Sequence, residues 1–425
     1  MHQKSVAILV MLIFLVSSVW GGGFALYEFG GRASAMGGAT VAQAVDPSTI
    51  FYNPAGLAFL KGTQFYGGTT LIFPKARYVG PEPYPWAGEV YDAESQVFTP
   101  IGVYISHKFN ERLGVGIGIT NPFGLGLKWS DDFPGKYFSK NSEIRSFYIS
   151  PVVAYQISPH ISLGGGLDIV TSQVILDRYL LVSMDPPNSD PGVEVGTVYM
   201  EGTSKLAVGF TASILARSER VGFGLSYRHR VINKFEDATA DFTIYDQYQT
   251  LFVDNLGLFV DQKGSTEIPF PGILTVGMYF RVTPKLGIEL DYNYYTWSIF
   301  QELVLDFENY RLDTKIEEDY RDSYTLRLGA HYELNDNLSL RAGYIRDKTP
   351  QPTYSVSPIL PDNDRNNFSF GFGYSTGKLK IDAGYMFVNF GTRSTFENGI
   401  PVAEFNGSYA SNASLIFFSF GYAIR

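Results

Sequence analysis

The stretch SYTLRLGAHYELNDNLSLRAGYIRD, residues 323–347, decides the fold. Its apolar side chains recur at every second position, at Leu326, Leu328, Ala330 and Tyr332, with polar residues or glycine between them. A period of two is the pattern of a β-strand with one apolar face. The turn residues Asn335-Asp336-Asn337 then join this run directly to a second one. The stretch therefore predicts an antiparallel hairpin that is apolar on one side and polar on the other.

The same pattern continues along the chain, and tight polar turns alternate with long polar segments. Outer-membrane barrels have short periplasmic turns and long extracellular loops, so this alternation is typical of them. A soluble β-sandwich or propeller is the alternative. Six hairpins with one strand at each end predict an all-β transmembrane antiparallel β-barrel of about fourteen strands. These strands are expected to begin near Gln64, Phe98, Leu113, Ser146, His160, Lys205, Val221, Ile273, Leu286, Ser323, Leu338, Asn367, Lys378 and Ser408. Long loops are expected at residues 81–94, 129–142, 185–196, 234–267, 302–322, 350–365 and 391–407.

The composition agrees with a membrane barrel and excludes other classes. Aromatic residues make up 16% of the chain and glycine occurs 44 times, which suits aromatic girdles at both membrane interfaces and a closely packed wall. The net charge of −9 argues against nucleic-acid binding, which needs a basic surface. Cysteine is absent, so disulfides and thiolate chemistry are excluded.

The first residues predict export. Lys4 precedes an apolar run at residues 6–16, and the small residues Ser17, Ser18 and Gly21 to Gly23 follow, with the bulky Trp20 among them. This is the layout of a signal peptide, predicted at residues 1–21. An uncleaved membrane anchor is the alternative, but the run is shorter than the ~20 residues that span a bilayer. Residues 63–425 are then expected to form the barrel in a bacterial outer membrane.

Residues 22–62 lack the strand pattern. The segment GGRASAMGGA, residues 30–39, is too small and too rich in glycine for a strand, and the sequence Asn53-Pro54-Ala55-Gly56 follows it. A wide barrel with nothing inside would be an open water pore. Residues 22–62 are therefore expected to fold into the lumen as a hatch, or plug.

Several segments, taken in order, resemble the outer-membrane family of long-chain fatty acid and aromatic hydrocarbon transporters that includes FadL. The matching segments are GFALYE (23–28), MGGA (36–39), FYNPAG (51–56), NPFGL (121–125), YYTWS (294–298) within residues 269–297, and LPDNDR (360–365). Their order and spacing cover nearly the whole mature chain. The resemblance implies a fourteen-strand barrel with an N-terminal hatch, in agreement with the strand count.

The resemblance also implies passive uptake of hydrophobic small molecules, either fatty acids or hydrocarbons. Extracellular loops would capture the molecule, and a wall gap at a kinked third strand would release it sideways. Glycine weakens a strand and proline removes a ladder hydrogen bond; the candidate gap residues are Gly118, Asn121, Pro122, Phe123 and Gly124. The hatch motif near that kink is expected at Asn53, Pro54, Ala55 and Gly56. The alternative is that Asn53-Pro54-Ala55-Gly56 is an ordinary turn and that Asn121-Pro122 only begins an extracellular loop.

Ligand contacts are predicted in the apolar part of residues 234–267 and in the loop before it, because an exposed apolar patch usually marks a binding surface. The candidates are Leu180, Leu181, Met184, Leu251, Phe252, Leu256 and Phe259. Packing of these residues against one another is an equal alternative. By alternation Arg327 and Arg341 face the lumen, where they could hold a carboxylate or could pair with lumenal acids.

No pattern in the chain indicates an enzyme. The histidines lack metal-ligand spacing, and no nucleophile elbow or phosphate-binding loop is present, so no catalytic residue, metal or cofactor is expected. A lipid hydrolase would need His107 or His331 beside a serine. The run Glu317-Glu318-Asp319 is interpreted as solvated loop charge.

An aqueous porin is the main alternative to the hydrophobic channel, and a structural or adhesive role is a further one. The expected partners are the hydrophobic cargo, outer-membrane lipid and lipopolysaccharide, and the barrel assembly machinery. Nucleic acid is not expected as a partner, and the protein is expected to be a monomer.

Overall fold

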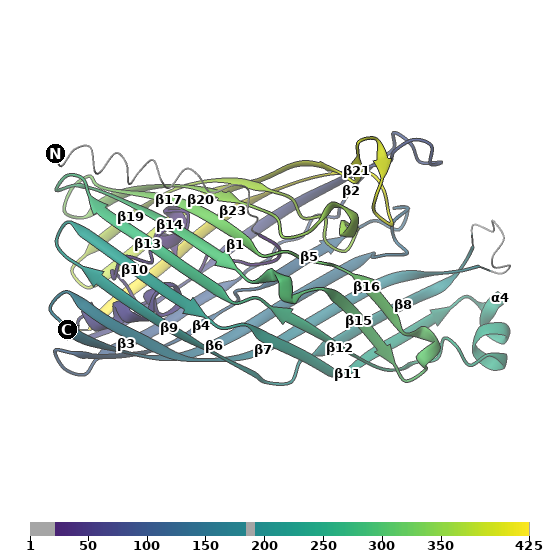
Figure 1. The fold of residues 1–425 in the computed structure, drawn as a ribbon, viewed down its shortest axis with the longest axis horizontal. Coiled ribbons are helices and arrows are strands. Elements are labelled where there is room, and N and C mark those ends of the chain that lie inside the picture. The colour runs from purple at the N-terminus through teal and green to yellow at the C-terminus, as the bar shows by residue number, and fades with distance from the viewer. Residues whose placement is uncertain (1–21, 184–191, 425) are drawn as a thin grey trace.

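The computed structural model describes residues 22–183 and 192–424. Within these residues, fourteen antiparallel wall strands form one closed barrel, because the last strand pairs with the first over seventeen residues, from Thr63↔Ile424 to Val79↔Ser408 (Figure 1). In chain order the wall strands are β1 (Thr63–Val79); β2 (Val90–Asp92) with β3 (Ile101–Lys108); β4 (Leu113–Thr120) with β5 (Gly124–Lys128); β6 (Asn141–Ser158); β7 (Ile161–Val182); β8 (Val193–Thr203) with β9 (Ala207–Arg217); β10 (Val221–Arg228) with β11 (Val231–Ile244); β12 (Gln262–Phe270) with β13 (Ile273–Arg281); β14 (Leu286–Tyr295) with β15 (Glu302–Phe307); β16 (Thr314–Glu317) with β17 (Ser323–Glu333); β18 (Leu338–Asp347); β19 (Arg365–Thr376); β20 (Leu379–Ser394); and β23 (Ser408–Ile424). The predicted barrel is confirmed.

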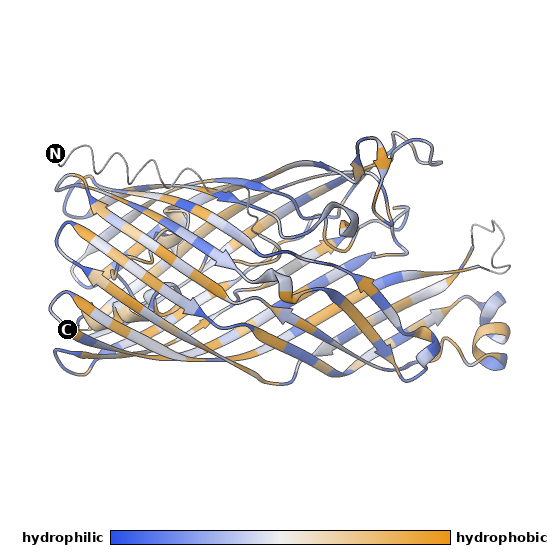
Figure 2. Ribbon diagram, viewed as in Figure 1, coloured by the Kyte–Doolittle hydropathy of each residue, from blue (hydrophilic) through white to orange (hydrophobic). Residues whose placement is uncertain are grey.

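The alternating sequence forms this wall because successive side chains of a strand point to opposite faces. On β14, Glu289 and Asp291 are buried in the lumen, with 0% and 1% of their surface exposed, whereas Leu290 between them is 46% exposed on the outside. Figure 2 shows hydrophobic and hydrophilic residues alternating along the strands. The apolar outer positions therefore meet lipid, and the polar positions line the interior.

The predictions that residues 234–267 and 302–322 are loops were wrong over much of their length. Strands β11, β12, β15 and β16 extend through these segments. Charged residues occupy outward positions there and pair across the strands, as Lys234 does with Glu267 at 2.7 Å and Lys263 with Asp237 at 3.0 Å. This part of the wall continues into water, where charge replaces the apolar outer face that identifies a strand within lipid.

Residues 22–60 lie inside the barrel, in the half that carries the short turns (Figure 1). Small and apolar residues allow this segment to fold compactly, and nearly all of them are buried. It contains the helices α2 (Gly31–Ala35) and α3 (Thr49–Tyr52) and the 3-10 helix η1 (Pro54–Phe59). The predicted signal peptide lies outside the described residues.

The remaining short elements lie in the connections between wall strands. They are α4 (Asp246–Gln249), the π-helical turn η2 (Thr250–Asn255), the 3-10 turns η3 (Trp297–Ile299), η4 (Tyr310–Leu312) and η5 (Thr353–Ser355), and the small hairpin of β21 (Phe396–Glu397) and β22 (Ile400–Pro401). No helix in the described part of the chain is long and apolar enough to cross a membrane.

Candidate functional site

Acidic side chains of the wall hold the backbone of the N-terminal segment. The amides of Thr40 and Val41 donate to Asp291 Oδ2 at 2.9 and 3.2 Å, and the amide of Ala42 donates to Glu289 Oε1 at 2.6 Å. Buried backbone N–H groups need hydrogen-bond acceptors, and these two carboxyl groups supply them. The lumenal acids of β14 therefore fix the N-terminal segment at one wall of the barrel.

The motif at Asn53 docks on a different part of the wall. Asn53 Nδ2 donates to the carbonyl oxygens of Val41 at 2.7 Å and of Ile214 at 3.1 Å. The Ala55 amide donates to Ser213 Oγ at 2.9 Å, and Gly164 lets this backbone approach because a side chain there would overlap Pro54 and Ala55. The motif packs against β7 and β9, and the 3-10 helix η1, which contains most of it, also contacts β4 of the third wall strand.

Replacing Asn53 by alanine is expected to weaken this docking. The side chain is fully buried and its amide nitrogen donates two hydrogen bonds, so its loss removes both bonds from the docked segment, at a cost of about 1–3 kcal/mol. Hydrogen exchange at the amides of residues 40–56 should become faster. Asn110→Ala, in an exposed turn, is the control. Unchanged exchange in Asn53→Ala would contradict this assignment.

The third wall strand is interrupted at the predicted residues. Between β4 and β5, Asn121, Pro122 and Phe123 leave the strand ladder. The Asn121 side chain takes the place of missing backbone partners: its Oδ1 accepts from the Ile101 amide at 2.9 Å, and its Nδ2 donates to the Ser146 carbonyl at 2.7 Å. Among the described residues, β4 pairs with both neighbouring strands, whereas β5 pairs with β6 alone. One side of β5 is thus without a ladder partner in the wall.

The beginning of the N-terminal segment lies across this interruption. The Leu26 amide donates to the Pro122 carbonyl at 2.9 Å, and the Gly124 amide donates to the Phe24 carbonyl at 3.0 Å. Backbone groups freed by the interruption are therefore satisfied from inside the barrel by the N-terminal segment. Gly118, the other predicted residue, lies on β4 and faces Tyr104 and Ile50.

A cavity of about 460 Å³ adjoins the unpaired side of β5; we call it the wall cavity. It reaches from Phe24 and Leu26 inside the barrel to residues 97–101 of the second wall strand. The Phe98 ring lies so close over Gly126 that a methyl group at Gly126 would overlap it. A single aromatic ring thus fills the space between the second and third wall strands at this level.

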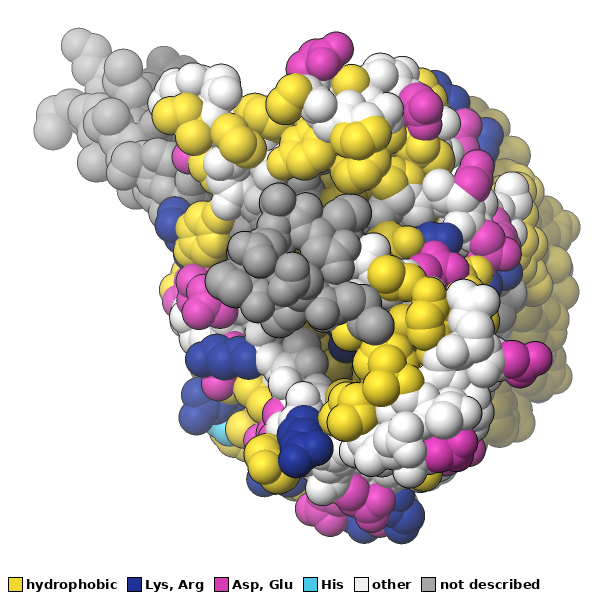
Figure 3. All heavy atoms as spheres, turned by 90° about the vertical axis from the view of Figure 1, so that its right-hand side faces the viewer, with side chains coloured by type: hydrophobic (Ala, Val, Ile, Leu, Met, Phe, Trp, Pro, Cys, Tyr) yellow, Lys and Arg dark blue, Asp and Glu magenta, His cyan; other side chains and the backbone are white. Residues whose placement is uncertain are grey.

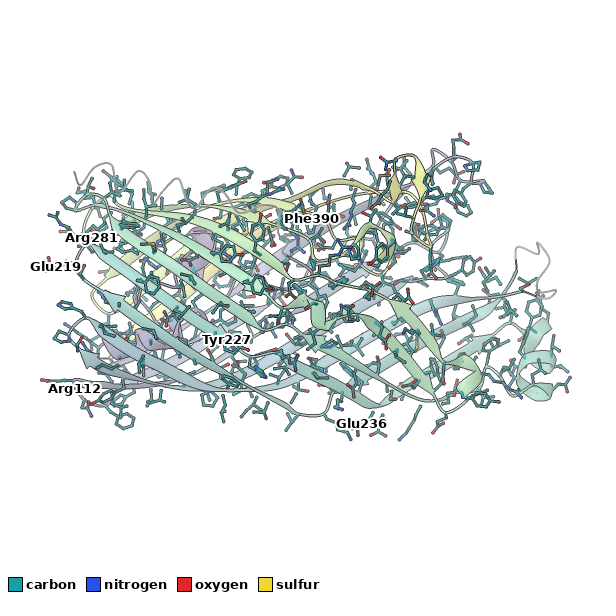
Figure 4. The ribbon with its side chains drawn as sticks, viewed as in Figure 1. Arg112, Glu219, Tyr227, Glu236, Arg281 and Phe390 are labelled. Atoms are coloured by element: carbon teal, nitrogen blue, oxygen red, sulfur yellow. The ribbon has the colours of Figure 1, made fainter. Side chains whose placement is uncertain are left out.

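Another wall of this cavity is formed by Arg365 and Phe390. The Arg365 guanidinium lies over the ring of Phe390, 4.5 Å from its centroid, and Figure 4 labels Phe390 in the upper part of the barrel. Arg365 Nη2 also pairs with Asp362 Oδ1 at 2.7 Å. Asp362 therefore already balances the positive charge of Arg365.

A second cavity, of about 110 Å³, lies in the lumen; we call it the lumenal cavity. Its lining includes Ile144, Leu176, Met200 and Leu303. It shares Phe24, Ile144 and Leu360 with the wall cavity. The Phe24 ring packs edge-on against Trp297, with 4.7 Å between the ring centroids. Phe24 therefore lies where the two cavities meet.

Several predicted ligand contacts lie beyond the lumenal cavity, toward the end with the long loops. Leu180, Phe252 and Phe259 are buried in one cluster with Leu176 and Met200, so they continue the apolar lining of the lumenal cavity. Leu181, Leu251 and Leu256 are exposed. Met184 lies outside the described residues. Figure 3, which looks onto this end, shows hydrophobic side chains gathered around a hollow.

The two predicted carboxylate anchors lie elsewhere. The Arg327 guanidinium is 4.1 Å from the Tyr27 ring centroid, and Arg341 Nη1 pairs with Asp382 Oδ1 at 2.6 Å. Neither arginine is among the described residues that line the two cavities. Both therefore act in the packing of the N-terminal segment and the wall.

Four residues that line the cavities were not predicted from the sequence: Phe24, Phe98, Gly126 and Glu318. Phe24 belongs to a segment that carries the family resemblance, which was the available signal. The interpretation of Glu318 as solvated charge was wrong, because only 5% of its surface is exposed. An acidic run gives no sign of which member turns inward.

The comparisons with known proteins agree with this architecture. A family model described as "Outer membrane protein transport protein (OMPP1/FadL/TodX)" matches residues 12–424. The long-chain fatty acid transport protein of Escherichia coli O6:H1 is 25% identical, with 100% of each chain covered. The 47 kDa outer membrane protein of Pasteurella multocida is 27% identical, with 87% of each chain covered.

Solved structures share the fold. A FadL homologue from Pseudomonas aeruginosa superposes with a TM-score of 0.80 at 20% identity, covering 96% of this chain and 100% of that one. The Pseudomonas putida toluene transporter TodX superposes with a TM-score of 0.72 at 15% identity, covering 94% of this chain and 99% of that one. The chain, an outer-membrane β-barrel, therefore belongs to the outer membrane protein transport family that includes OMPP1, FadL and TodX.

Proposed function

We propose that this protein is an outer-membrane channel for the passive uptake of hydrophobic small molecules, such as fatty acids or hydrocarbons. The observation that carries the proposal is the run of apolar space from the loop cluster around Phe252, through the lumenal cavity, to the wall cavity at the interrupted third strand. Its relatives include a long-chain fatty acid transport protein and a toluene transporter, which supports the same class of cargo.

In this mechanism the molecule first binds among the apolar loop residues and then enters the lumenal cavity. Apolar surface leaves water at both steps, which favours binding without directional contacts. Phe24 lies between the lumenal cavity and the wall cavity, so a displacement of its ring connects the two cavities. The molecule then leaves sideways past Phe98, where β5 lacks a wall partner, and enters the lipid directly.

The mechanism needs no reaction chemistry. His107 Nδ1 is bonded to Thr63 Oγ1 at 2.8 Å, and His331 Nδ1 accepts from Arg341 Nε at 3.1 Å. Among the described residues, neither histidine is therefore hydrogen-bonded to a serine hydroxyl, as the histidine of a lipid hydrolase would be. An aqueous porin is the competing function, and the N-terminal segment within the lumen argues against it.

Extraction mass spectrometry on protein purified from its native membrane tests the proposal. A porin purified in parallel from the same membrane is the control, because it carries the same lipid and detergent background. We expect a fatty acid or hydrocarbon that is enriched over this control. A protein that carries no such molecule and conducts ions in a planar bilayer would instead be an aqueous porin.

A further inference from the structure

A buried carboxyl group lines the otherwise apolar lumenal cavity. Glu318 is 95% buried there, and its Oε2 has no hydrogen-bond partner within the described chain. Backbone bonds fix the residue on both sides: the Glu318 amide donates to the Gln301 carbonyl at 2.8 Å, and the Tyr320 amide donates to the Phe300 carbonyl at 3.0 Å. A buried polar atom without a partner costs free energy, which a ligand group can recover.

A second unpartnered polar atom lies on the same cavity. Thr266 Oγ1 is buried without a hydrogen-bond partner among the described residues, and Thr266 belongs to the cavity lining. Among the other acids of the lining, Glu201 and Asp306 are exposed. Glu143 Oε1 also lacks a hydrogen bond, but Glu143 is ion-paired with Arg145, whereas Glu318 is in no ion pair among the described residues. The cavity thus offers hydrogen-bonding capacity at Glu318 and Thr266 within apolar walls.

The lumenal cavity also lacks a positive charge. Among the described residues that line it, none is Lys, Arg or His. A ligand carboxylate in this cavity would lie beside Glu318 with no cation to balance it, in surroundings of low dielectric constant. Burial raises the pKa of Glu318 to about 8, so near neutral pH its carboxyl carries a proton that it can donate to an oxygen atom.

We propose that Glu318 makes the lumenal cavity select neutral hydrophobic molecules that carry one hydrogen-bonding oxygen, such as alcohols and ketones, over carboxylates. This inference rests on the proposed function and narrows its cargo. The volume of about 110 Å³ is smaller than the ~150 Å³ of an apolar cavity that holds benzene, but the lumenal cavity adjoins the wall cavity, with which it shares Phe24, Ile144 and Leu360. The cavity therefore suits a single substituted ring or the polar end of a chain.

Equilibrium dialysis of the full mature chain in amphipol tests the inference, with radiolabelled toluene, benzyl alcohol and benzoate as matched probes. The wild-type chain should bind benzyl alcohol about tenfold more tightly than toluene, and benzoate most weakly. Glu318→Gln, which keeps the shape and cannot ionise, should leave the binding of benzyl alcohol at neutral pH unchanged. At about pH 9.5, above the pKa of about 8 of Glu318, it should bind benzoate about tenfold better than wild type, because only the wild-type side chain is ionised there. Glu317→Gln, at the exposed neighbouring position, is the matched control and should change nothing.

Glu318→Leu should reduce the affinity for benzyl alcohol to that for toluene, because the donor is gone. If Glu318→Gln folds and binds all three probes with wild-type ratios at about pH 9.5 as well, the inference is overturned while the proposed function stands. If the wild-type chain binds none of the three probes, the inference is overturned, and the proposed function is decided separately by the extraction experiment.

Discussion

Replacing Pro122 and Gly124 together by valine is expected to lower uptake of a hydrophobic cargo by about tenfold or more, a barrier increase of at least 1.4 kcal/mol. Valine at 122 restores the backbone N–H that proline lacks, and β-branched residues favour a continuous strand. At position 124 an added side chain would meet Leu26 Cδ1 at 3.0 Å and press on the N-terminal segment. Both changes favour closure of the wall beside β5.

Uptake of a radiolabelled cargo by a host that lacks its own transporter of this family is the measurement, normalised to the amount of folded barrel. The matched control combines Pro284→Val, in a short turn, with Gly165→Val on β7, away from the interruption. The control should transport as the wild type does. Undiminished uptake in the Pro122 and Gly124 variant would remove the lateral route from the mechanism.

Deleting residues 22–56 is expected to convert the barrel into an ion-conducting pore. The deletion removes the segment that occupies the lumen and leaves Glu289 and Asp291, which now bond its backbone, free to take up water. Closure of the wall does not depend on this segment, because β1 and β23 pair directly. The barrel should therefore assemble and conduct steadily in a planar bilayer.

The wild-type chain and a deletion of residues 395–402, which removes the small hairpin of β21 and β22, are the controls for this experiment. Both keep the N-terminal segment in the lumen and should show little steady conductance. A folded deletion of residues 22–56 that remains closed would mean that another part of the chain blocks the lumen.

Much of the wall could be predicted from the sequence, because apolar side chains recur at every second position of a strand with one apolar face. The short turns also mark where neighbouring strands join at one end of the barrel. The prediction weakened where the wall leaves the bilayer, because paired charges such as Lys234 and Glu267 resemble loop composition. There the pattern depends on which strand lies opposite, and composition alone does not reveal that.

The roles of the lumenal arginines depend on contacts that skip a strand. Arg341 on β18 reaches Asp382 on β20 across β19, and Gly373 makes room, because a side chain there would overlap the guanidinium. Period two correctly places both charges in the lumen. It cannot say which charges meet, because that depends on glycine positions in the strand between them.

The two cavities could not be predicted from the two-residue period of the sequence either. Glu318 has no periodic neighbour that marks it as buried. The contact of Phe98 with Gly126 joins two segments that are separated by the hairpin of β3 and β4. The candidate gap residues were found because proline and glycine interrupt a strand locally. Sites made by distant segments require the register of the barrel.

The most direct test of lateral release is to close the gap reversibly between the second and third wall strands. The chain has no cysteine, so the double variant Phe98→Cys and Gly126→Cys can be joined by a short bis-methanethiosulfonate and released by a reductant. The single-cysteine variants, treated in the same way, are the controls. We predict that cargo uptake by the double variant falls on cross-linking and returns on reduction, while the controls do not change. Uptake that continues at its starting rate through the cross-linked barrel would contradict the account.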